Sequence, residues 1–340
     1  MITVMEPGRF TSVQDRGREG FAHLGVPRAG AADSLSLRQA NLLAGNPEYA
    51  AALEMTLSGP TLRFETNTVI ALAGGRLDAC LDDSPIPMYQ SVSVRVGQVL
   101  ICGTILTGMR SYLAVAGGFS TVVALNSAST DTFAGLGPPV LRAGDSLVIR
   151  AHNPHQGWYL RAPPEFSGVV TLRAITGPHA EWFTAGALED FLQSGFEVRA
   201  DSDRTGLRLA GERISRSNRS ELRSQGMVSG AVQVPGDGHP IVLLPNHGTT
   251  GGYPVIAVVI RADLPRLGQL RPGAKLRFEV VGREQALAAL QFSEAKLHHD
   301  IIPADPGLLA ARSFMVLAKS HPSLREARLQ MGQLHVRLRR

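Results

Sequence analysis

The segment Leu270-Arg-Pro-Gly-Ala-Lys-Leu-Arg-Phe-Glu-Val280 decides the fold class of this chain. It opens with a turn that contains proline and glycine, and then apolar Leu276, Phe278 and Val280 alternate with charged residues. Alternation with a period of two places one set of side chains on each face of a β-strand. The segment therefore predicts a half-buried strand that follows a tight turn.

The same arrangement recurs along the chain. Leu141-Arg-Ala-Gly-Asp-Ser-Leu147 repeats the pattern Leu-Arg-x-Gly-x-x-Leu, and Arg95-Val-Gly-Gln-Val99 is a looser copy. Short strands separated by glycine and proline turns favour barrels or sandwiches over a doubly wound sheet, so the expected fold class is mainly β with a few short helices. Apolar runs predict further strands at residues 69–72, 92–96, 147–149, 169–175, 241–244 and 255–260.

Few segments are expected to be helical. Asp33 or Ser34 has a side chain suited to cap a helix that runs to Ala44, and Gly45 is placed to end it. Three further segments have the composition of helices, at residues 187–192, 282–292 and 306–318.

Length and composition limit the possible classes of protein. With 340 residues, 44% of them hydrophobic, the chain is expected to form two domains, residues 1–155 and 165–340, joined by a linker near 151–168. The net charge is +5, but the cations are scattered and aromatic residues are only 6%, so nucleic-acid binding is not expected. No apolar run is long enough to span a membrane, and Cys80 and Cys102 form no framework, so we expect a cytoplasmic protein.

Three polar, glycine-rich stretches are candidates for a site. They comprise residues 11–20 with 25–33, residues 108–118 with 126–131, and residues 246–254. Glycine lets backbone N–H groups approach a ligand, and hydroxyl and amide groups are neutral donors suited to a carbonyl or carboxylate. The structural alternative is that they only turn between buried strands.

Two other features have simpler explanations. His298-His299-Asp300 could ligate a metal, but adjacent helical side chains diverge and no partner cluster is visible, so no metal site is expected. Glu54 lies among apolar residues, where a carboxylate needs a partner, so we interpret it as half of a core ion pair.

The three polar stretches are similar to the signature sequences of a known family. It is historically called allophanate hydrolase subunit 2, and also the biotin-dependent carboxyltransferase family or the 5-oxoprolinase C subunit. The resemblance extends over residues 2–290 and implies tandem cyclophilin-like β-barrels. The segments that carry it include Val13-Gln-Asp-Arg-Gly-Arg-Glu-Gly20, Ser111-Tyr-Leu-Ala-Val-Ala-Gly-Gly118, Ser129-Thr-Asp131, Arg204-Thr-Gly206, Gly230-Ala-Val-Gln-Val-Pro235 and Thr249-Thr-Gly-Gly-Tyr-Pro254.

The resemblance implies an enzyme that works only within a complex. We expect a hydrolase that opens the cyclic amide 5-oxoproline to glutamate with ATP, together with a homologue of the family's subunit 1 (the B subunit) and a lactam-utilisation-type A subunit. Since the chain has no Gly-x-x-x-x-Gly-Lys-Ser/Thr loop, the partner is expected to supply the nucleotide site. One alternative is the carboxyltransferase component of a biotin-dependent urea carboxylase, and another is a non-catalytic regulator that binds the subunit 1 homologue.

Site roles follow from the motifs and their chemistry. We assign catalytic roles to Asn246, His247 and Thr250, with His247 available for proton transfer near neutral pH. Substrate-binding roles are assigned to Asp15, Arg18, Asp33, Ser129, Thr130, Thr249, Gly251, Gly252 and Tyr253.

Three departures from the family pattern bear on activity. Ala128 stands where an arginine is usual, Asn246-His247-Gly248 replaces Asp-x-Gln, and Pro138-Pro139 interrupts a usual Gly-Gly-Arg run. Loss of a guanidinium removes a carboxylate anchor, and replacement of aspartate by asparagine removes a possible base. These departures are the reason for keeping the regulator interpretation open.

Overall fold

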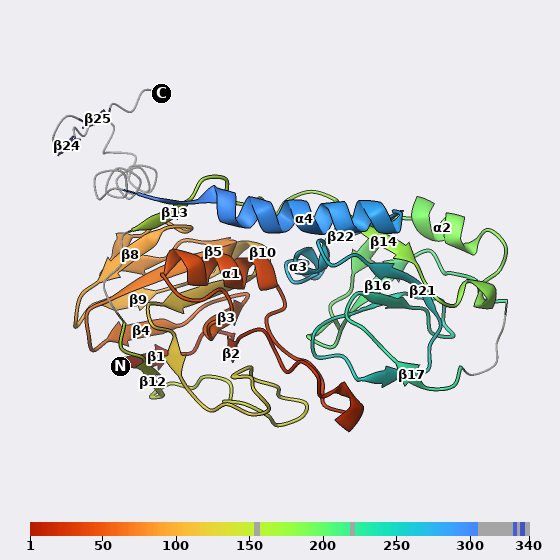
Figure 1. Ribbon diagram of the computed structural model, residues 1–340, viewed down its shortest axis with the longest axis horizontal. Helices are drawn as coiled ribbons and strands as arrows, with labels where there is room; N and C mark the ends of the chain where they lie inside the picture. The colour runs from red at the N-terminus through yellow and green to blue at the C-terminus, as the bar shows by residue number, and fades with distance from the viewer. Residues whose placement is uncertain (153–156, 218–221, 305–328, 332–333, 337–340) are drawn as a thin grey trace.

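The computed structural model describes residues 1–152, 157–217, 222–304, 329–331 and 334–336. It contains two β-rich units side by side, with the long helix α4 (Arg283–Asp300) lying across both (Figure 1). The expectation of a mainly β fold with few helices is confirmed. The helix expected at residues 306–318 lies outside the described residues.

The N-terminal unit consists of two sheets. The first has the order β11 (Phe119–Ser120), β12 (Ser146–Ile149), β1 (Ile2–Glu6), β4 (Thr61–Phe64), β9 (Val99–Ile101), β6 (Cys80–Leu81) and β7 (Ser84–Pro85). The second has the order β2 (Phe10–Gln14), β3 (Ala52–Thr56), β10 (Ile105–Val115), β5 (Thr68–Leu77) and β8 (Ser91–Val94). Apolar side chains from both sheets share one core, which includes Phe64, Leu53 and Leu113.

Helix α1 (Ser34–Leu43) covers the other face of the second sheet. Leu37, Ala40 and Leu43 pack there against small strand residues, so the sheet is buried on both faces. The helix begins where Asp33 accepts a hydrogen bond from the Ser36 N–H at 2.9 Å, and Gly45 follows it with φ 76°. Both expected helix signals are therefore confirmed.

The C-terminal unit is a closed barrel. Its strands run in the order β14 (Val170–Thr176), β21 (Val255–Val259), β18 (Ala231–Gln233), β19 (Ile241–Leu243), β16 (Gly206–Gly211), β15 (Phe196–Val198) and β22 (Lys275–Val280). In β22, Leu276 and Phe278 are buried between exposed charged neighbours, which confirms the alternation expected there. Val280, expected on the buried face, is 37% exposed because the strand ends at that residue.

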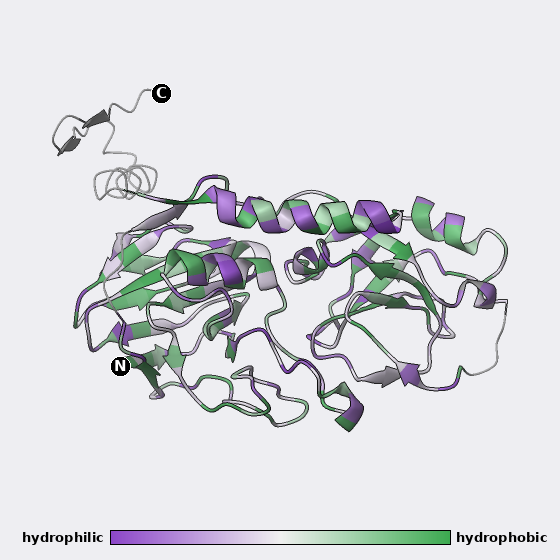
Figure 2. Ribbon diagram, in the orientation of Figure 1, coloured by the Kyte–Doolittle hydropathy of each residue, from purple (hydrophilic) through white to green (hydrophobic). Residues whose placement is uncertain are grey.

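Both ends of the second unit return to the first. β13 (Trp158–Leu160), within the expected linker, pairs with β23 (Ile301–Pro303). Helix α4 continues to Asp300, beyond the expected end at 292, and carries the chain back across both units. Figure 2 shows hydrophobic residues concentrated on the strands and a mixture of polar and apolar residues along α4.

Short elements complete the fold. They are η1 (Ala22–Leu24), η2 (Ala180–Trp182), α2 (Ala187–Gln193), α3 (Leu264–Leu267), the β17 (Gln225–Gly226) and β20 (Thr250–Gly251) pair, and the β24 (Leu329–Met331) and β25 (Leu334–Val336) pair. Of these, α2 matches the helix expected at 187–192.

Candidate functional site

The two units meet where the start of α1 contacts the residue that follows α3. A Cβ atom added at Gly268 would collide with the Ala32 carbonyl oxygen, so the two backbones touch. The Gly268 carbonyl oxygen also accepts a hydrogen bond from Arg110 Nη1 at 2.7 Å. Only glycine permits this approach, which brings polar side chains of both units together.

Glu54 of β3 lies at this junction with its side chain fully buried. Its Oε2 atom accepts hydrogen bonds from the Ala32 N–H at 2.9 Å and the Tyr112 hydroxyl at 2.7 Å. Arg110 Nε lies 3.4 Å from Oε1, and Arg204 Nη1 of the second unit is paired with the same oxygen. Burial alone would raise the pKa of Glu54, but Arg204 and Arg110 outweigh it and lower that pKa.

Arg204 connects this ion pair to the rest of the interface. Its Nη2 atom donates to the Gly30 carbonyl oxygen at 2.5 Å, and its Nε atom donates to Asn246 Oδ1 at 3.2 Å. Asn246 in turn donates through Nδ2 to Asp131 Oδ1 at 3.3 Å. One guanidinium therefore orients an amide that contacts a buried carboxylate of the opposite unit.

Two residues that were expected in the site, Asp15 and Ser129, are in contact. Asp15 Oδ1 accepts from the Ser129 hydroxyl at 2.5 Å and the Ser127 hydroxyl at 2.6 Å, and Oδ2 accepts from the Ala128 N–H at 2.7 Å. The Ala128 side chain packs in the core, 6% exposed. The residue that departs from the family pattern thus supplies a backbone donor to Asp15.

Arg18 and Asp131 have buried polar atoms without partners. Arg18 is 1% exposed and donates through Nη2 to the Ser129 carbonyl oxygen, but within the described residues its Nε and Nη1 atoms have no hydrogen-bond partner. Asp131 is also 1% exposed, and its Oδ2 atom has none in the same ranges. Burial lowers the pKa of Arg18, opposed by Asp131 and Asp15. Such atoms are uncommon in folded proteins and often mark a functional position.

We call two neighbouring groups of hydrogen-bonded side chains, which meet where the Asp131 charge acts on Arg18, the barrel-interface network. It consists of Asp15, Arg18, Glu54, Ser129, Asp131, Arg204 and Asn246. Thr130 lies beside it, 4% exposed, and its Oγ1 atom has no hydrogen-bond partner in the described part of the chain.

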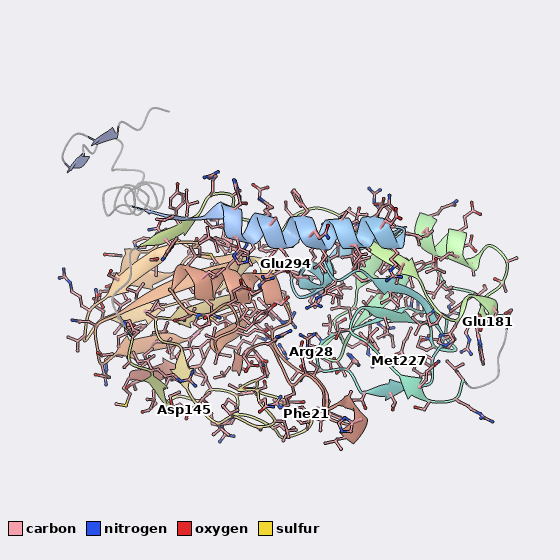
Figure 3. All side chains as sticks on the ribbon, in the orientation of Figure 1. Phe21, Arg28, Asp145, Glu181, Met227 and Glu294 are labelled. Carbon is pink, nitrogen blue, oxygen red and sulfur yellow. The ribbon has the colours of Figure 1, made fainter. Side chains whose placement is uncertain are left out.

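A cavity of about 90 Å³ opens beside Asp15 between the two units. We call it the arginine cavity because Arg16, Arg28, Arg38 and Arg261 contribute to its lining. Arg38 is neutralised by Glu294 of α4 at 2.6 Å, whereas Arg261 forms no hydrogen bond or ion pair in the described ranges. Figure 3 shows Arg28 between the units and Glu294 on the helix above them.

Glu19 partly neutralises the rim of this cavity. It lies 3.1 Å from Arg16 Nη2 and 2.9 Å from Arg28 Nη2, and all three side chains are more than 40% exposed. Exposed ion pairs of this kind hold their partners weakly, so both guanidinium groups remain available to an anion.

Asp33 faces a different hollow from the network. Its carboxylate caps α1 and accepts from Gln269 Nε2 at 2.6 Å, and burial raises its pKa. It borders a cavity of about 590 Å³ whose lining includes Phe166 and Leu270. The structure therefore gives Asp33 a role in holding α1 against the second unit.

Only part of the third polar stretch, residues 246–254, contacts the barrel-interface network. Asn246 belongs to the network, but His247 is 8% exposed and its Nδ1 atom lies 2.7 Å from the Gly248 carbonyl oxygen. Within the described residues, no hydrogen bond joins the 249–253 segment to the network. Thr249, Thr250, Gly251 and Gly252 form or flank the β17–β20 pair, and Tyr253 borders a separate hollow with Arg199 and His239.

The adjacent histidines at the end of α4 each lie beside a carboxylate. His298 is 3.1 Å from Glu48, and His299 is 3.0 Å from Asp300. Among the described residues, no group of three or more His, Cys, Asp or Glu side chains could hold a metal ion. No helix in that part of the chain combines the length and apolar character needed to cross a bilayer.

Sequence reasoning assigned no site role to Glu54, Asp131, Arg204 or Arg261. Asp131 and Arg204 belong to motifs of the family, but the sequence did not indicate a site role for either, because their interaction partners are far away in the sequence. Arg261 precedes Ala262-Asp263 and carried no signal at all. The spatial arrangement alone brings these side chains to the interface.

The chain belongs to a family of carboxyltransferase domains. The family model of the carboxyltransferase domain, subdomains A and B, matches residues 24–280. It is 39% identical over 300 residues to the 5-oxoprolinase C subunit of Escherichia coli (strain K12), covering 86% of this chain and 94% of that protein. It is 36% identical to the corresponding protein of Haemophilus influenzae, covering 84% and 93% of the two chains.

Solved structures of larger proteins contain the same fold. The Kluyveromyces lactis urea amidolyase matches with a TM-score of 0.81 and 29% identity over 89% of this chain. The protein TTHA0988 matches with a TM-score of 0.74 and 38% identity over 82% of this chain. The chain spans 21% of the first structure and 55% of the second, so each carries substantial polypeptide beyond the shared part.

Proposed function

We propose that this chain is the C subunit of a 5-oxoprolinase-type hydrolase, which opens a cyclic amide with ATP and is active only with companion subunits. The observation that carries the proposal is the 39% identity that extends over 94% of the E. coli C subunit. By contrast, the match covers only 17% of the Saccharomyces cerevisiae urea amidolyase. The chain thus corresponds to nearly all of one relative and to a fraction of the other.

The arginine cavity supports a substrate with a carboxylate. 5-Oxoproline carries one carboxylate beside its lactam, and guanidinium groups bind carboxylates through charge-assisted hydrogen bonds. Arg261 is the main candidate for this contact. Its charge helps to lower the pKa of Glu294, but the Glu294 carboxylate is paired directly with Arg38, so Arg261 is left without an ion-pair partner in the described residues. Arg16 and Arg28 lie on the same lining and share only one carboxylate, Glu19.

The network supports recognition of the amide itself. A lactam presents one carbonyl acceptor and one N–H donor, while Arg18 has unused donors and Asp131 an unused acceptor. Both groups are buried, so a lactam reaches them only after the side chains around them rearrange. In this role Asn246 is a positioning residue, since it contacts Asp131 and is itself held by Arg204.

The arginine cavity does not fit an adenine nucleotide. The arginine cavity has a volume of about 90 Å³, whereas sites for small-molecule ligands typically occupy about 300–1,000 Å³. The chain also lacks the glycine-rich phosphate loop. We therefore assign ATP to one of the companion subunits and route no step through it on this chain.

The role of the 249–253 segment remains a proposal. Thr250 is exposed on the β17–β20 pair, where its hydroxyl could contact substrate only if a companion closes over that face. His247 is available for proton transfer only if its ring turns away from the Gly248 carbonyl oxygen. Replacing each by alanine in the assembled complex tests both assignments, because turnover would fall without a loss of assembly.

The alternative is carboxyl transfer, favoured by the family model and the likeness to the urea amidolyase. Biotin would be required only in this case, carried by another polypeptide. It predicts avidin-sensitive fixation of bicarbonate onto urea when the chain is combined with a biotin carrier and a biotin carboxylase. Absence of such fixation would exclude it.

The decisive experiment is reconstitution. The purified chain is combined with homologues of the family's A and B subunits, and glutamate is measured after addition of 5-oxoproline and ATP. We expect glutamate formation that requires all of the components. A complex that assembles but forms no glutamate would contradict the proposed function.

A further inference from the structure

Residues 121–137 form a surface loop with two exposed apolar turns, which we call the apolar loop. Val122 is 62% exposed, Val123 58%, Leu125 37% and Phe133 80%. Large apolar side chains gathered on one loop lose contact with water when a partner covers them. Such patches on a protein surface commonly mark an interface.

The apolar loop presents no charge to the solvent. Asp131 is the only ionisable side chain between residues 121 and 137, and it is buried. Charged residues are depleted from the centre of protein interfaces, because burying an unpaired charge is costly. This surface therefore fits an apolar, uncharged protein face.

The first turn holds a leucine in a costly backbone conformation. Leu125 has φ 52° and Asn126 has φ 61°, and reciprocal hydrogen bonds of 2.9 and 3.2 Å between Ala124 and Ser127 fix the turn. Side chains at positive φ are uncommon, especially bulky ones, and the strain tends to persist at functional positions. Here it presents the Leu125 side chain outward.

The two exposed turns flank the stretch that carries the network. Ser127, Ser129 and Asp131 lie between them and are all buried. Asp131 accepts hydrogen bonds from the Phe133 N–H at 3.0 Å and the Ala134 N–H at 3.1 Å, so the second turn is attached directly to its carboxylate. A protein bound to the turns would thus fix the position of Asp131.

We propose that the apolar loop is the docking surface for a companion subunit with an apolar, uncharged face, an inference that rests on the proposed function. Similar proteins indicate that the partner bound at this loop is another subunit. The E. coli and H. influenzae relatives are named as subunits, and TTHA0988 and the urea amidolyase carry further polypeptide in the same chain. Binding of the companion would then hold Asp131 of the barrel-interface network in place.

The outer face of α4 is the competing surface. Phe292 is 70% exposed and Leu287 50% on this helix. Helix α4 lies along the opposite edge of the molecule from the segment 121–137 (Figure 1). Exposed Arg283, Glu284 and Lys296 share that helix, and no network residue lies on it. This contrast makes Phe292 a matched control for Phe133.

The test measures binding of the full-length chain to its subunit 1 homologue by isothermal titration calorimetry. Phe133→Asp and Val122→Asp are each compared with Phe292→Asp, and thermal unfolding verifies that every variant folds. We expect the two loop variants to raise the Kd at least tenfold and Phe292→Asp to change it less than twofold. Unchanged binding by both loop variants would overturn the proposal, as would loss of binding in Phe292→Asp alone.

Other outcomes separate the docking surface from the function itself. If the wild-type chain is a dimer by light scattering and Phe133→Asp only makes it a monomer, the occupant is a second copy and the proposal is wrong. If the assembled wild-type complex forms no glutamate but the loop variants still prevent assembly, the proposed function is wrong and the docking surface is supported. If the wild-type chain binds no subunit 1 homologue, both the proposed function and the docking surface are wrong.

Discussion

Arg204 of the C-terminal barrel forms an ion pair with Glu54, a fully buried carboxylate of the N-terminal unit. The same guanidinium contacts the Gly30 carbonyl oxygen and Asn246, so it joins the two units and orients the network at once. Because a cation of one unit neutralises a buried charge of the other, the two units are expected to unfold as one cooperative body.

Replacing Arg204 by alanine is predicted to destabilise the whole chain. Glu54 would keep Arg110 as its one cationic partner, and breaking a buried pair typically costs about 3–5 kcal/mol. Arg204→Lys should cost less but still fail to restore Asn246, since an ammonium lacks the guanidinium fork. Urea unfolding measures both, with the exposed Arg95→Ala as the control. A loss below about 0.5 kcal/mol for Arg204→Ala, the range of ordinary surface substitutions, would contradict the account.

The close approach at Gly268 makes a second prediction. In Gly268→Ala the new methyl group would meet the Ala32 carbonyl oxygen, forcing the units apart at a cost of about 1–3 kcal/mol. Gly236→Ala is the control, because a Cβ there has nothing within 4 Å. Thermal unfolding should show a lower Tm only for Gly268→Ala. Equal Tm values for the two variants would show that the interface adapts easily.

His247 is predicted to contribute to acid sensitivity. Burial lowers the pKa of its ring below the ordinary value of 6.5, while the Gly248 carbonyl oxygen acts in the opposite direction. The unfolded chain therefore binds more protons than the folded one as the pH falls below 6.5, so stability is lost in that range. Unfolding measured from about pH 7.5 to about pH 5 should show a shallower loss for His247→Gln. Identical pH profiles would mean that this ring does not titrate differently on folding.

Arg261 is predicted to act on substrate binding. In the reconstituted complex, Arg261→Gln should raise the KM for 5-oxoproline about tenfold or more with little change in kcat, because a charge-assisted contact is lost in both the ground and transition states. Arg95→Gln, exposed on the first unit, serves as the control. A KM equal to that of the wild type would place the substrate carboxylate elsewhere.

Local sequence patterns predicted much of the fold. The alternation of Leu276 and Phe278 and the capping by Asp33 are determined by neighbouring residues, and the structure has both. Helix α4 was expected to end at 292, where the segment rich in Ala, Leu and Gln ends. In the structure, its last turns are held by distant contacts such as that of Arg38 with Glu294, which no local pattern reveals.

The candidate site was predicted only in part. Asp15, Arg18 and Ser129 do meet, and Asn246 contacts Asp131, but Asp15 and Ser129 are 114 residues apart, so their pairing depends on the packing of the sheets. His247 and the 249–253 segment were grouped with Asn246 because the whole polar, glycine-rich stretch 246–254 resembles a family signature. Within the described residues, only Asn246 of this stretch forms hydrogen bonds with side chains of the network.

The central claim is that the junction of the two units forms the amide-binding site of a 5-oxoprolinase. The most direct test is the rate of glutamate formation from 5-oxoproline and ATP by complexes containing wild-type or Asp131→Asn chains, with assembly verified by gel filtration. The account predicts glutamate formation by the wild type and a loss of about 100-fold or more in kcat for Asp131→Asn, within the range for a positioned acid–base or orienting group. Wild-type activity in an assembled Asp131→Asn complex would contradict it.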